Sequence, residues 1–309
     1  MKININAYAK INLYLAVTGR RENGYHDIES VMQSVSLHDV VTVSAEASEE
    51  SSITLTCSDP SLPTDSKNLA YRAAQTYLNV TGMDHVAVKI HIEKHIPVAA
   101  GLAGGSADAA GTLIAINALS SRPLPTKALC DIGARLGADI PFVIRGGTMT
   151  ALGIGEILSP CEPMPEYPIL IVRPKESVST AAAYAKIDEN SLFSSPKTLD
   201  GMTYALLSGS LESIAGAAYN VFEEVLPEGT EVFRIKSILE ANGAALSMMS
   251  GSGPSVFGIF NDEDTAKDAA DALRAVGYES EICYPVPSVE DNCTSDCSSC
   301  GANCPYSKK

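Results

Sequence analysis

The chain has 309 residues, of which 45% are hydrophobic and 19% charged, a composition that allows two globular cores and excludes a disordered protein. Its formal net charge is −15 and no basic cluster exceeds two residues, which argues against nucleic acid as the main ligand. No apolar run has the length of a membrane span and the N-terminus shows no cleavable leader, so we expect a cytoplasmic protein without a membrane partner.

The first part of the chain is predicted to be rich in β-structure. Three segments with alternating or continuous apolar residues predict strands at 5–17, 27–45 and 51–57. Residues 66–82 have apolar residues at helical spacing and end in a glycine, which is typical of a helix. Residues 85–96 alternate again and predict a strand with one apolar face.

Residues 96–111, IPVAAGLAGGSADAAG, have almost no large side chains. Without a Cβ atom, Gly101, Gly104 and Gly105 can reach positive φ and turn their amide N–H groups toward one anion. A helix is predicted from Ser106, and a helix N-terminus adds unpaired donors and partial positive charge. The run therefore predicts a phosphate site, with a close-packed glycine turn as the alternative. Its spacing is neither that of a Walker A loop nor that of the dinucleotide-binding fingerprint.

Helices and strands are predicted to alternate beyond this run. Residues 125–137 predict a helix with Thr126 as its N-cap, and residues 137–158 predict a tight loop with short strands. Prolines around residues 161–167 indicate a domain boundary. The remaining segments predict a strand at 168–174, helices at 179–187, 211–226 and 231–241, a strand at 245–261, a helix at 263–277 and a strand at 279–286.

Two segments carry candidate catalytic side chains. Lys10 and Asn12 are two residues apart in a predicted strand, so they present a cation and an amide from the same face. Asp139 follows a helix end in a loop expected to face a cleft, where its sharper interpretation is a general base near a lysine. The alternatives are an exposed strand lysine and an aspartate that caps a helix or turn. Gly251 and Gly253 indicate a second glycine loop or a β-bulge.

Taken together, these segments resemble the GHMP kinases. PVAAGLAGGSADAA is similar to the P-x-x-x-G-L-x-G-G-S-S/A motif of that superfamily, with Ala103 where glycine is frequent and Ala107 where a second serine is frequent. AYAKINLYL with GYH, LGADIPFVIRGG and SGSGPSVFGIF resemble the other motifs of one branch, whose substrate is 4-diphosphocytidyl-2-C-methyl-D-erythritol. The motifs stand in that branch's order and extend over about residues 1–285.

The resemblance implies an α+β fold of two domains. The N-terminal domain would be ribosomal-protein-S5-like and the C-terminal domain a ferredoxin-like α/β sandwich. The implied ranges are 1–160 and 161–287, with an additional tail at 288–309.

The resemblance also implies a role for each motif. Asp139 would take the proton from the substrate hydroxyl beside Lys10, and Mg²⁺ would screen the triphosphate of ATP. Asn68 and Lys94 would lie near the adenine. The ATP phosphates would be wrapped by Pro97, Val98, Ala99, Ala100, Gly101, Leu102, Ala103, Gly104, Gly105, Ser106 and Ala107.

On the acceptor side, the resemblance implies a cytidyl diphosphate alcohol as a small-molecule partner. His26 would hydrogen-bond the cytosine, Tyr25 would stack on it and Tyr184 would close its other face. Asn12 would lie near the phosphates or hydroxyls of the substrate. The implied reaction is phosphorylation of the substrate's 2-hydroxyl in the non-mevalonate isoprenoid pathway, by a monomer or a homodimer.

Two other functions remain open at this point. One is another small-molecule kinase of the superfamily, of the homoserine or mevalonate type. The other is a nucleotide-sensing or metal-binding module that kept the fold without catalysis. The presence of both Lys10 and Asp139 argues against such a module, because binding alone needs no base.

The resemblance does not account for four cysteines near the C-terminus. Cys293, Cys297, Cys300 and Cys304 have the spacing C-x₃-C-x₂-C-x₃-C. Four close thiols can hold one tetrahedral metal ion. In a reduced cytosol we expect zinc rather than an iron–sulfur cluster at such a site. The alternative is a disordered tail with reactive thiols.

Overall fold

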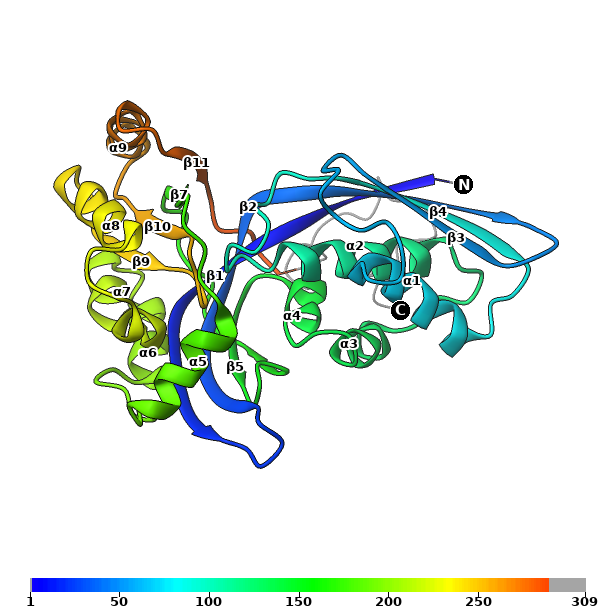
Figure 1. Ribbon diagram of the computed structural model, residues 1–309, viewed down its shortest axis with the longest axis horizontal. Helices are drawn as coiled ribbons and strands as arrows, with labels where there is room; N and C mark the ends of the chain where they lie inside the picture. Colours follow the sequence, from blue (N-terminus) through cyan, green and yellow to red (C-terminus); the bar gives the residue numbers. More distant parts are fainter. Residues whose placement is uncertain (1, 289–309) are drawn as a thin grey trace.

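One long β-hairpin runs through both halves of the molecule, as the computed structural model of residues 2–288 shows (Figure 1). It consists of β1 (Lys2–Arg20) and β2 (His26–Ala47), paired antiparallel. Val41 of β2 belongs to the first hydrophobic core, whereas Leu15 and Val17, nearer the turn, belong to the second. The hairpin therefore connects the two cores.

The larger sheet has seven strands in the order β3–β4–β2–β1–β8, with β5 paired to β2 and β6 to β5. The strands added to the hairpin are β3 (Ser52–Cys57), β4 (Val86–Glu93), β5 (Thr148–Leu152), β6 (Ile157–Pro160) and β8 (Tyr219–Asn220). Four helices lie on one side of this sheet, on the right in Figure 1: α1 (Leu69–Thr81), α2 (Gly104–Leu119), α3 (Thr126–Ala134) and α4 (Ile140–Arg145). The alternation predicted for β4 is confirmed, since every second residue from Val86 is buried.

The smaller sheet is antiparallel, with the order β11–β7–β10–β9. Its strands are β7 (Ile169–Arg173), β9 (Leu246–Met249), β10 (Val256–Ile259) and β11 (Glu279–Cys283). The helices of this half are α5 (Thr180–Glu189), α6 (Leu199–Ser208), α7 (Leu211–Ala217), the 3₁₀ helix η1 (Val221–Val225), α8 (Glu231–Ala241) and α9 (Glu263–Ala275). The α+β class is confirmed, and the domain division at residue 160 stays a prediction. No helix within residues 2–288 is long and apolar enough to cross a bilayer.

Several predicted elements are wrong in detail. Thr126 is the first residue of α3 and Pro125 its N-cap, while the predicted loop at 137–158 contains α4. Residues 211–226 are not one helix, because Tyr219 and Asn220 leave it to pair with β1. The predicted strand 245–261 is a hairpin of β9 and β10, and α6 was not predicted. At Tyr219 and Asn220, pairing with β1 has overridden local helical propensity.

After β11 the chain returns to the larger sheet. The amide of Val286 donates to the carbonyl of Ser34 at 2.9 Å, and the amide of Ser36 donates to the carbonyl of Tyr284 at 2.8 Å. Single bridges join Pro285 to β2 and Ser288 to Gly146. Residues 284–288, which we call the returning strap, thus belong to the sheet that the first residues of the chain began.

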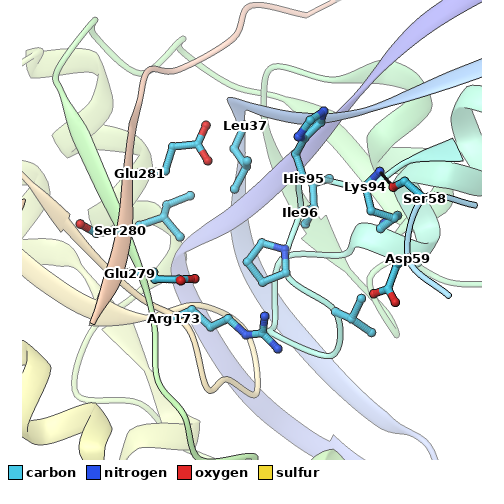
Figure 2. A pocket seen from close by; sticks show the side chains of 13 residues that line it. Leu37, Ser58, Asp59, Lys94, His95, Ile96, Arg173, Glu279, Ser280 and Glu281 are labelled. Carbon is cyan, nitrogen blue, oxygen red and sulfur yellow. Dashed lines mark hydrogen bonds between the residues drawn. The ribbon is translucent and has the colours of Figure 1, made fainter. Parts of the chain in front are cut away.

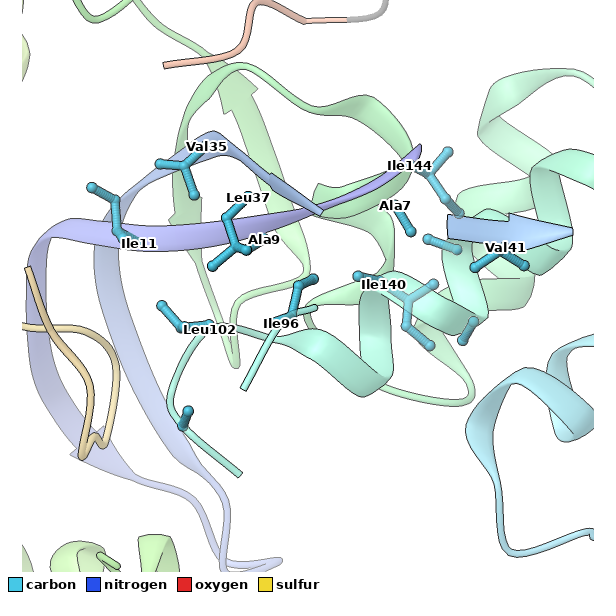
Figure 3. Packing of buried hydrophobic residues seen from close by; sticks show 14 of the residues in the cluster. Ala7, Ala9, Ile11, Val35, Leu37, Val41, Ile96, Leu102, Ile140 and Ile144 are labelled. Atoms are coloured by element: carbon cyan, nitrogen blue, oxygen red, sulfur yellow. The ribbon is translucent and has the colours of Figure 1, made fainter. Parts of the chain in front are cut away.

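The glycine run is anchored to the first core by its apolar side chains. Ile96 and Leu102 are 2% and 1% exposed and point toward β1 and β2, where they pack among residues such as Ala9 and Leu37 (Figure 3). Ala100, between them, is also buried. These apolar side chains hold the middle of the run against the sheet.

A second glycine loop, residues 250–255 between β9 and β10, packs directly on this run. The Ser250 hydroxyl donates to the carbonyl of Gly101 at 3.0 Å, and the amide of Ser255 donates to the carbonyl of Ala100 at 3.2 Å. A Cβ atom on Gly101 would lie 2.1 Å from the Ser250 carbonyl oxygen, and φ of Gly101 is +77°. Only glycine fits at this contact.

Gly101→Ala should therefore lower the free energy of unfolding, by about 3 kcal/mol, because the new methyl group meets backbone and φ is left-handed. Urea unfolding followed by circular dichroism measures the change. Gly216→Ala is the matched control: it lies in α7, its Cβ would meet nothing within 4 Å, and stability should stay level or rise slightly. A Gly101→Ala variant as stable as the wild type would contradict the close packing of the two loops.

Candidate active site

Lys10 lies in the middle of β1 with its side chain buried, 5% exposed. Its Nζ donates to Asn12 Oδ1 at 2.7 Å, which confirms that the two side chains share one strand face. Asn12 Nδ2 donates to Ser30 Oγ at 2.8 Å, and Ser30 Oγ donates to the carbonyl of Tyr14 at 2.6 Å. This relay fixes the ammonium group. The relay also engages both the oxygen and the nitrogen of the Asn12 side chain. Contact of Asn12 with substrate stays a prediction.

Asp139 is half-buried immediately before α4, and its carboxylate caps no helix. Within residues 2–288 this carboxylate makes no hydrogen bond or salt bridge, but it interacts electrostatically with Lys10 and Tyr184. Burial lowers the pKa of Lys10, and the charge of Asp139 opposes that shift. Burial raises the pKa of Tyr184 to about 12, with a further contribution from Asp139. The arrangement leaves the Asp139 oxygens available to accept a proton close to a buried cation.

The second glycine loop covers Lys10. A Cβ atom on Gly251 would lie 3.2 Å from Lys10 Nζ and 3.5 Å from Asn12 Oδ1. The loop is held by Asn220, whose Nδ2 donates to the carbonyl of Met249 at 2.7 Å and to that of Gly251 at 2.8 Å. A motif that is weak by itself in the sequence is thus part of the same site as Lys10.

The backbone before α2 has the form of an anion site. Ala99, Gly101 and Ala103 have φ of +53°, +77° and +60°, so left-handed residues alternate along the run. Such alternation turns successive N–H groups toward one point. No side chain caps the N-terminus of α2, so the donors of its first turn stay available. The amide of Lys10 donates to the carbonyl of Leu102 at 3.2 Å, which ties this anion loop to the lysine strand.

The loop that contains Asp139 lies beside the start of α2. A Cβ atom on Gly137 would be 3.8 Å from Ser106 Oγ, in the first turn of that helix. The glycine run, the lysine strand, the Asp139 loop and the second glycine loop therefore meet in one region. These are the four motifs that the sequence suggested as parts of one site.

A cavity of about 450 Å³ opens at the beginning of the glycine run (Figure 2). Lys94, His95 and Ile96 lie on one side of it, and Arg173 and Glu279 come from the smaller sheet. Pro97 and Val98 also line it. Three of the residues predicted to bind ATP thus share a cavity between the two sheets.

The ammonium of Lys94, however, is already engaged by the fold. Lys94 Nζ pairs with Asp39 and, at 2.9 Å, with Asp108 Oδ2, while Asp39 Oδ1 also accepts from the amides of His95 and Ile96 at 2.6 and 2.8 Å. Burial raises the pKa of Asp108 to about 7. The positive charge of Lys94 opposes this shift, and the negative charge of Asp39 adds to it. Two buried carboxylates share one cation, and Asp108 Oδ1 has no partner among the described atoms.

Asn68 has a structural role as the N-cap of α1. Its Oδ1 accepts from the amide of Ala70 at 2.9 Å and its Nδ2 donates to the carbonyl of Pro63 at 2.8 Å. These bonds account for the polar groups of its side chain. Contact of Asn68 or Lys94 with adenine stays a prediction.

Tyr25, His26 and Tyr184 line a second cavity, of about 510 Å³. The rings of His26 and Tyr184 are stacked, with centroids 4.5 Å apart and planes inclined by 19°, and Tyr25 is 60% exposed. Ala138, the neighbour of Asp139, also lines this cavity. The structure thus brings the three predicted cytosine contacts together next to Asp139, although Tyr184 already stacks on His26.

Some residues of the site are not among those predicted from the sequence. Asp39 and Asp108 were detectable as single acids in an apolar strand and a small-residue helix, where an unpaired charge would be costly. Asp188 stands four residues after Tyr184, at helical spacing, but the predicted helix ended at Ile187. Ser30 and Asn220 give no comparable signal.

The predicted cysteine site lies outside the described residues. Cys293, Cys297, Cys300 and Cys304 all follow Ser288, so their zinc site stays a prediction. Within residues 2–288, no three His, Cys, Asp or Glu side chains are grouped so as to hold a metal ion.

The sequence matches two family models, GHMP kinases N terminal domain over residues 68–147 and GHMP kinases C terminal over residues 202–279. A 4-diphosphocytidyl-2-C-methyl-D-erythritol kinase from Alkaliphilus metalliredigens is 42% identical over 283 residues, which cover 91% of this chain and 96% of that protein. One from Clostridium perfringens is 38% identical over 281 residues, with the same coverage of 91% and 96%.

Solved structures show the same relationship. The crystal structure of a 4-(cytidine 5′-diphospho)-2C-methyl-D-erythritol kinase has a TM-score of 0.77 and 32% identity, covering 92% of this chain and 99% of that one. The mevalonate kinase of Methanococcus jannaschii has a TM-score of 0.72 at 14% identity, covering 93% and 98%. The second similarity shows the fold alone.

The buried pair of acids predicts a pH dependence of stability. Because the pKa of Asp108 is raised to about 7 in the folded chain, above the value of about 3.9 for an exposed aspartate, the folded state binds this proton more tightly. The free energy of unfolding should fall as the pH rises through this range, by up to about 1.4 kcal/mol per pH unit. Asp108→Asn should remove that decline, measured by urea unfolding between pH 4.5 and 8. Asn at the exposed position Asp268 should leave the curve unchanged. An Asp108→Asn curve parallel to that of the wild type would contradict the shift.

Proposed function

Because this chain belongs to the GHMP kinase family and, within it, to the 4-diphosphocytidyl-2-C-methyl-D-erythritol kinases, we propose that it transfers the γ-phosphoryl group of ATP to the 2-hydroxyl of 4-diphosphocytidyl-2-C-methyl-D-erythritol. The products are the 2-phosphate and ADP, made in the cytoplasm on the non-mevalonate route to isoprenoids. The observation that carries this proposal is the position of Lys10 and Asp139, with an anion loop at Lys10 and an aromatic cavity beside Asp139.

On the donor side, backbone N–H groups replace a cluster of basic side chains. The chain as a whole is acidic, so the triphosphate must be attracted locally. The alternating left-handed residues 99, 101 and 103 and the uncapped start of α2 fit phosphate oxygens. When Mg²⁺ is bound with the triphosphate, it would neutralise part of the charge on the transferred group.

On the acceptor side, Asp139 takes the proton of the substrate 2-hydroxyl. The hydroxyl oxygen attacks the γ-phosphorus as the bond from that phosphorus to ADP breaks. The Asp139 carboxylate suits this role because no other protein group within residues 2–288 hydrogen-bonds it. Lys10, held by Asn12, orients the hydroxyl and offsets the negative charge that gathers around the reacting oxygens. Since Lys10 is buried, its electrostatic effect is weakly screened.

The cavity beside Asp139 favours a cytidyl substrate over the smaller alcohols of related kinases. Tyr25, His26 and Tyr184 give it aromatic surfaces and a ring nitrogen, which suit a nucleobase. Homoserine and mevalonate have no ring to place there. We therefore assign this cavity to the cytosine end of the substrate.

An ADP-release assay with 4-diphosphocytidyl-2-C-methyl-D-erythritol, homoserine and mevalonate tests this proposal. We expect turnover with the first substrate and a kcat/KM at least about 100-fold lower with the other two, because neither fills the aromatic cavity. Turnover of homoserine or mevalonate in preference to the cytidyl substrate, or of none of the three, would refute the proposal.

Asp139→Asn should keep ATP binding and lose about 100- to 10,000-fold in turnover, because the amide cannot accept the proton. Nucleotide binding by calorimetry and ADP release measure the two properties separately. Asp131→Asn is the control, since Asp131 is an exposed residue of α3 paired with Lys127. Full turnover in the Asp139→Asn variant would remove Asp139 from the reaction.

A further inference from the structure

Asp188, at the end of α5, binds the ring of His26 across 162 residues of sequence. His26 Nε2 and Asp188 Oδ1 are 2.7 Å apart, and the His26 side chain is only 7% exposed. A carboxylate accepts hydrogen bonds and donates none, so the proton between these atoms is on Nε2. Asp188 thus decides which ring nitrogen carries a proton.

The same helix fixes the plane of the ring. Tyr184 stands four residues before Asp188, so the two side chains lie on one face of α5. Tyr184 stacks on the imidazole at 4.5 Å while Asp188 holds its edge. Phe222 packs edge-on against Tyr184 at 4.9 Å and supports it. One helical turn therefore sets both the plane and the rotation of the His26 ring.

A third group keeps the carboxylate in place. Arg20 Nη1 lies 3.3 Å from Asp188 Oδ2, so the two oxygens of Asp188 have different partners. Arg20 and His26 are paired residues at the turn of the β1–β2 hairpin. The carboxylate bridges the two strand ends, with Oδ1 reserved for His26.

The other ring nitrogen, Nδ1, has no hydrogen-bond partner within residues 2–288 and is not sealed from solvent. His26 lines the 510 Å³ cavity together with Tyr25 and Tyr184. In the tautomer that has its proton on Nε2, Nδ1 has a lone pair and acts as an acceptor. The cavity thus contains one oriented acceptor supplied by a nearly buried side chain.

We propose that Asp188 is a positioning residue that makes Nδ1 of His26 an acceptor, and that the site thereby selects cytosine over uracil; this rests on the function proposed above. Cytosine has an amino group at C4, which donates a hydrogen bond. Uracil has a carbonyl oxygen at that position, which cannot donate and would face the lone pair of Nδ1. In the same pose, one base is bound and the other repelled.

The test compares the 4-diphosphocytidyl substrate with its 4-diphosphouridyl analogue in the wild type, Asp188→Asn and Asp188→Ala. In Asp188→Asn, the donor-only guanidinium of Arg20 attracts the amide oxygen, which leaves the amide N–H groups to face Nε2. The cytidyl-to-uridyl ratio of kcat/KM should fall by about 10- to 100-fold, through KM rather than kcat. In Asp188→Ala the unheld ring should also lower the ratio. Glu189→Gln, exposed on the same helix, should keep the wild-type ratio.

Nitrogen-15 spectra of the His26 ring give a readout that a merely structural role would not move. In the wild type we expect Nε2 protonated and Nδ1 unprotonated, and in Asp188→Asn a shift of the proton toward Nδ1. A fall in the ratio in either Asp188 variant, with the control unchanged, supports the proposal. A proton on Nδ1 in the wild type would overturn it. So would variants that weaken both substrates equally and leave the ratio unchanged.

Binding of cytidine 5′-diphosphate and uridine 5′-diphosphate by calorimetry separates this inference from the proposed reaction. A preference for the cytidine nucleotide that Asp188→Asn abolishes, in a chain that does not turn over the cytidyl alcohol, would refute the reaction and support the role of Asp188. Equal binding of both nucleotides by the wild type would overturn that role.

Discussion

The architecture of the site depends on the close approach of two glycine loops over one buried lysine. Gly101 touches the carbonyl of Ser250, and Gly251 lies against the Lys10 ammonium and its partner Asn12. The first contact leaves no space for a side chain, and at the second a Cβ atom would lie only 3.2 Å from Lys10 Nζ, on backbone with a left-handed φ. The loop suited to phosphate and the cation suited to the acceptor hydroxyl are therefore held in one fixed relation, and neither can shift without the other.

A single ionic cluster holds the glycine run at both ends. Asp39 accepts from the amides of residues 95 and 96, where the run begins, and Lys94 links Asp39 to Asp108, in the helical part of the run. The curvature of the run is thus set by buried charges outside the phosphate-facing backbone. Donors that are already oriented need no rearrangement when an anion arrives, which is the condition for strong electrostatic stabilisation in catalysis. It also explains how a chain with a net charge of −15 can accommodate a triphosphate.

Much of this site was predictable from sequence, and the missing parts share a physical cause. Alternation placed Lys10 and Asn12 on one face, and helical periodicity gave the bounds of α8 (Glu231–Ala241). Local patterns failed where a segment's conformation depends on a distant strand, as at Tyr219, which pairs with β1. The same holds for side chains. Asp188 acquires a role only because folding brings it to His26, and Asn68 and Lys94 use their polar groups within the fold, which a motif cannot reveal.

The returning strap joins the end of the smaller sheet to the hairpin that both cores share. Residues 284–288 form hydrogen bonds with Ser34 and Ser36, and the hairpin that contains these serines contributes to both cores. During synthesis the edge of β2 at these residues stays unfilled until almost 290 residues have left the ribosome. A chain interrupted within β11 would keep both sheets nearly complete in sequence, yet expose an open strand edge to other chains. Such a chain would be expected to associate through that edge, although its glycine loops are intact in sequence.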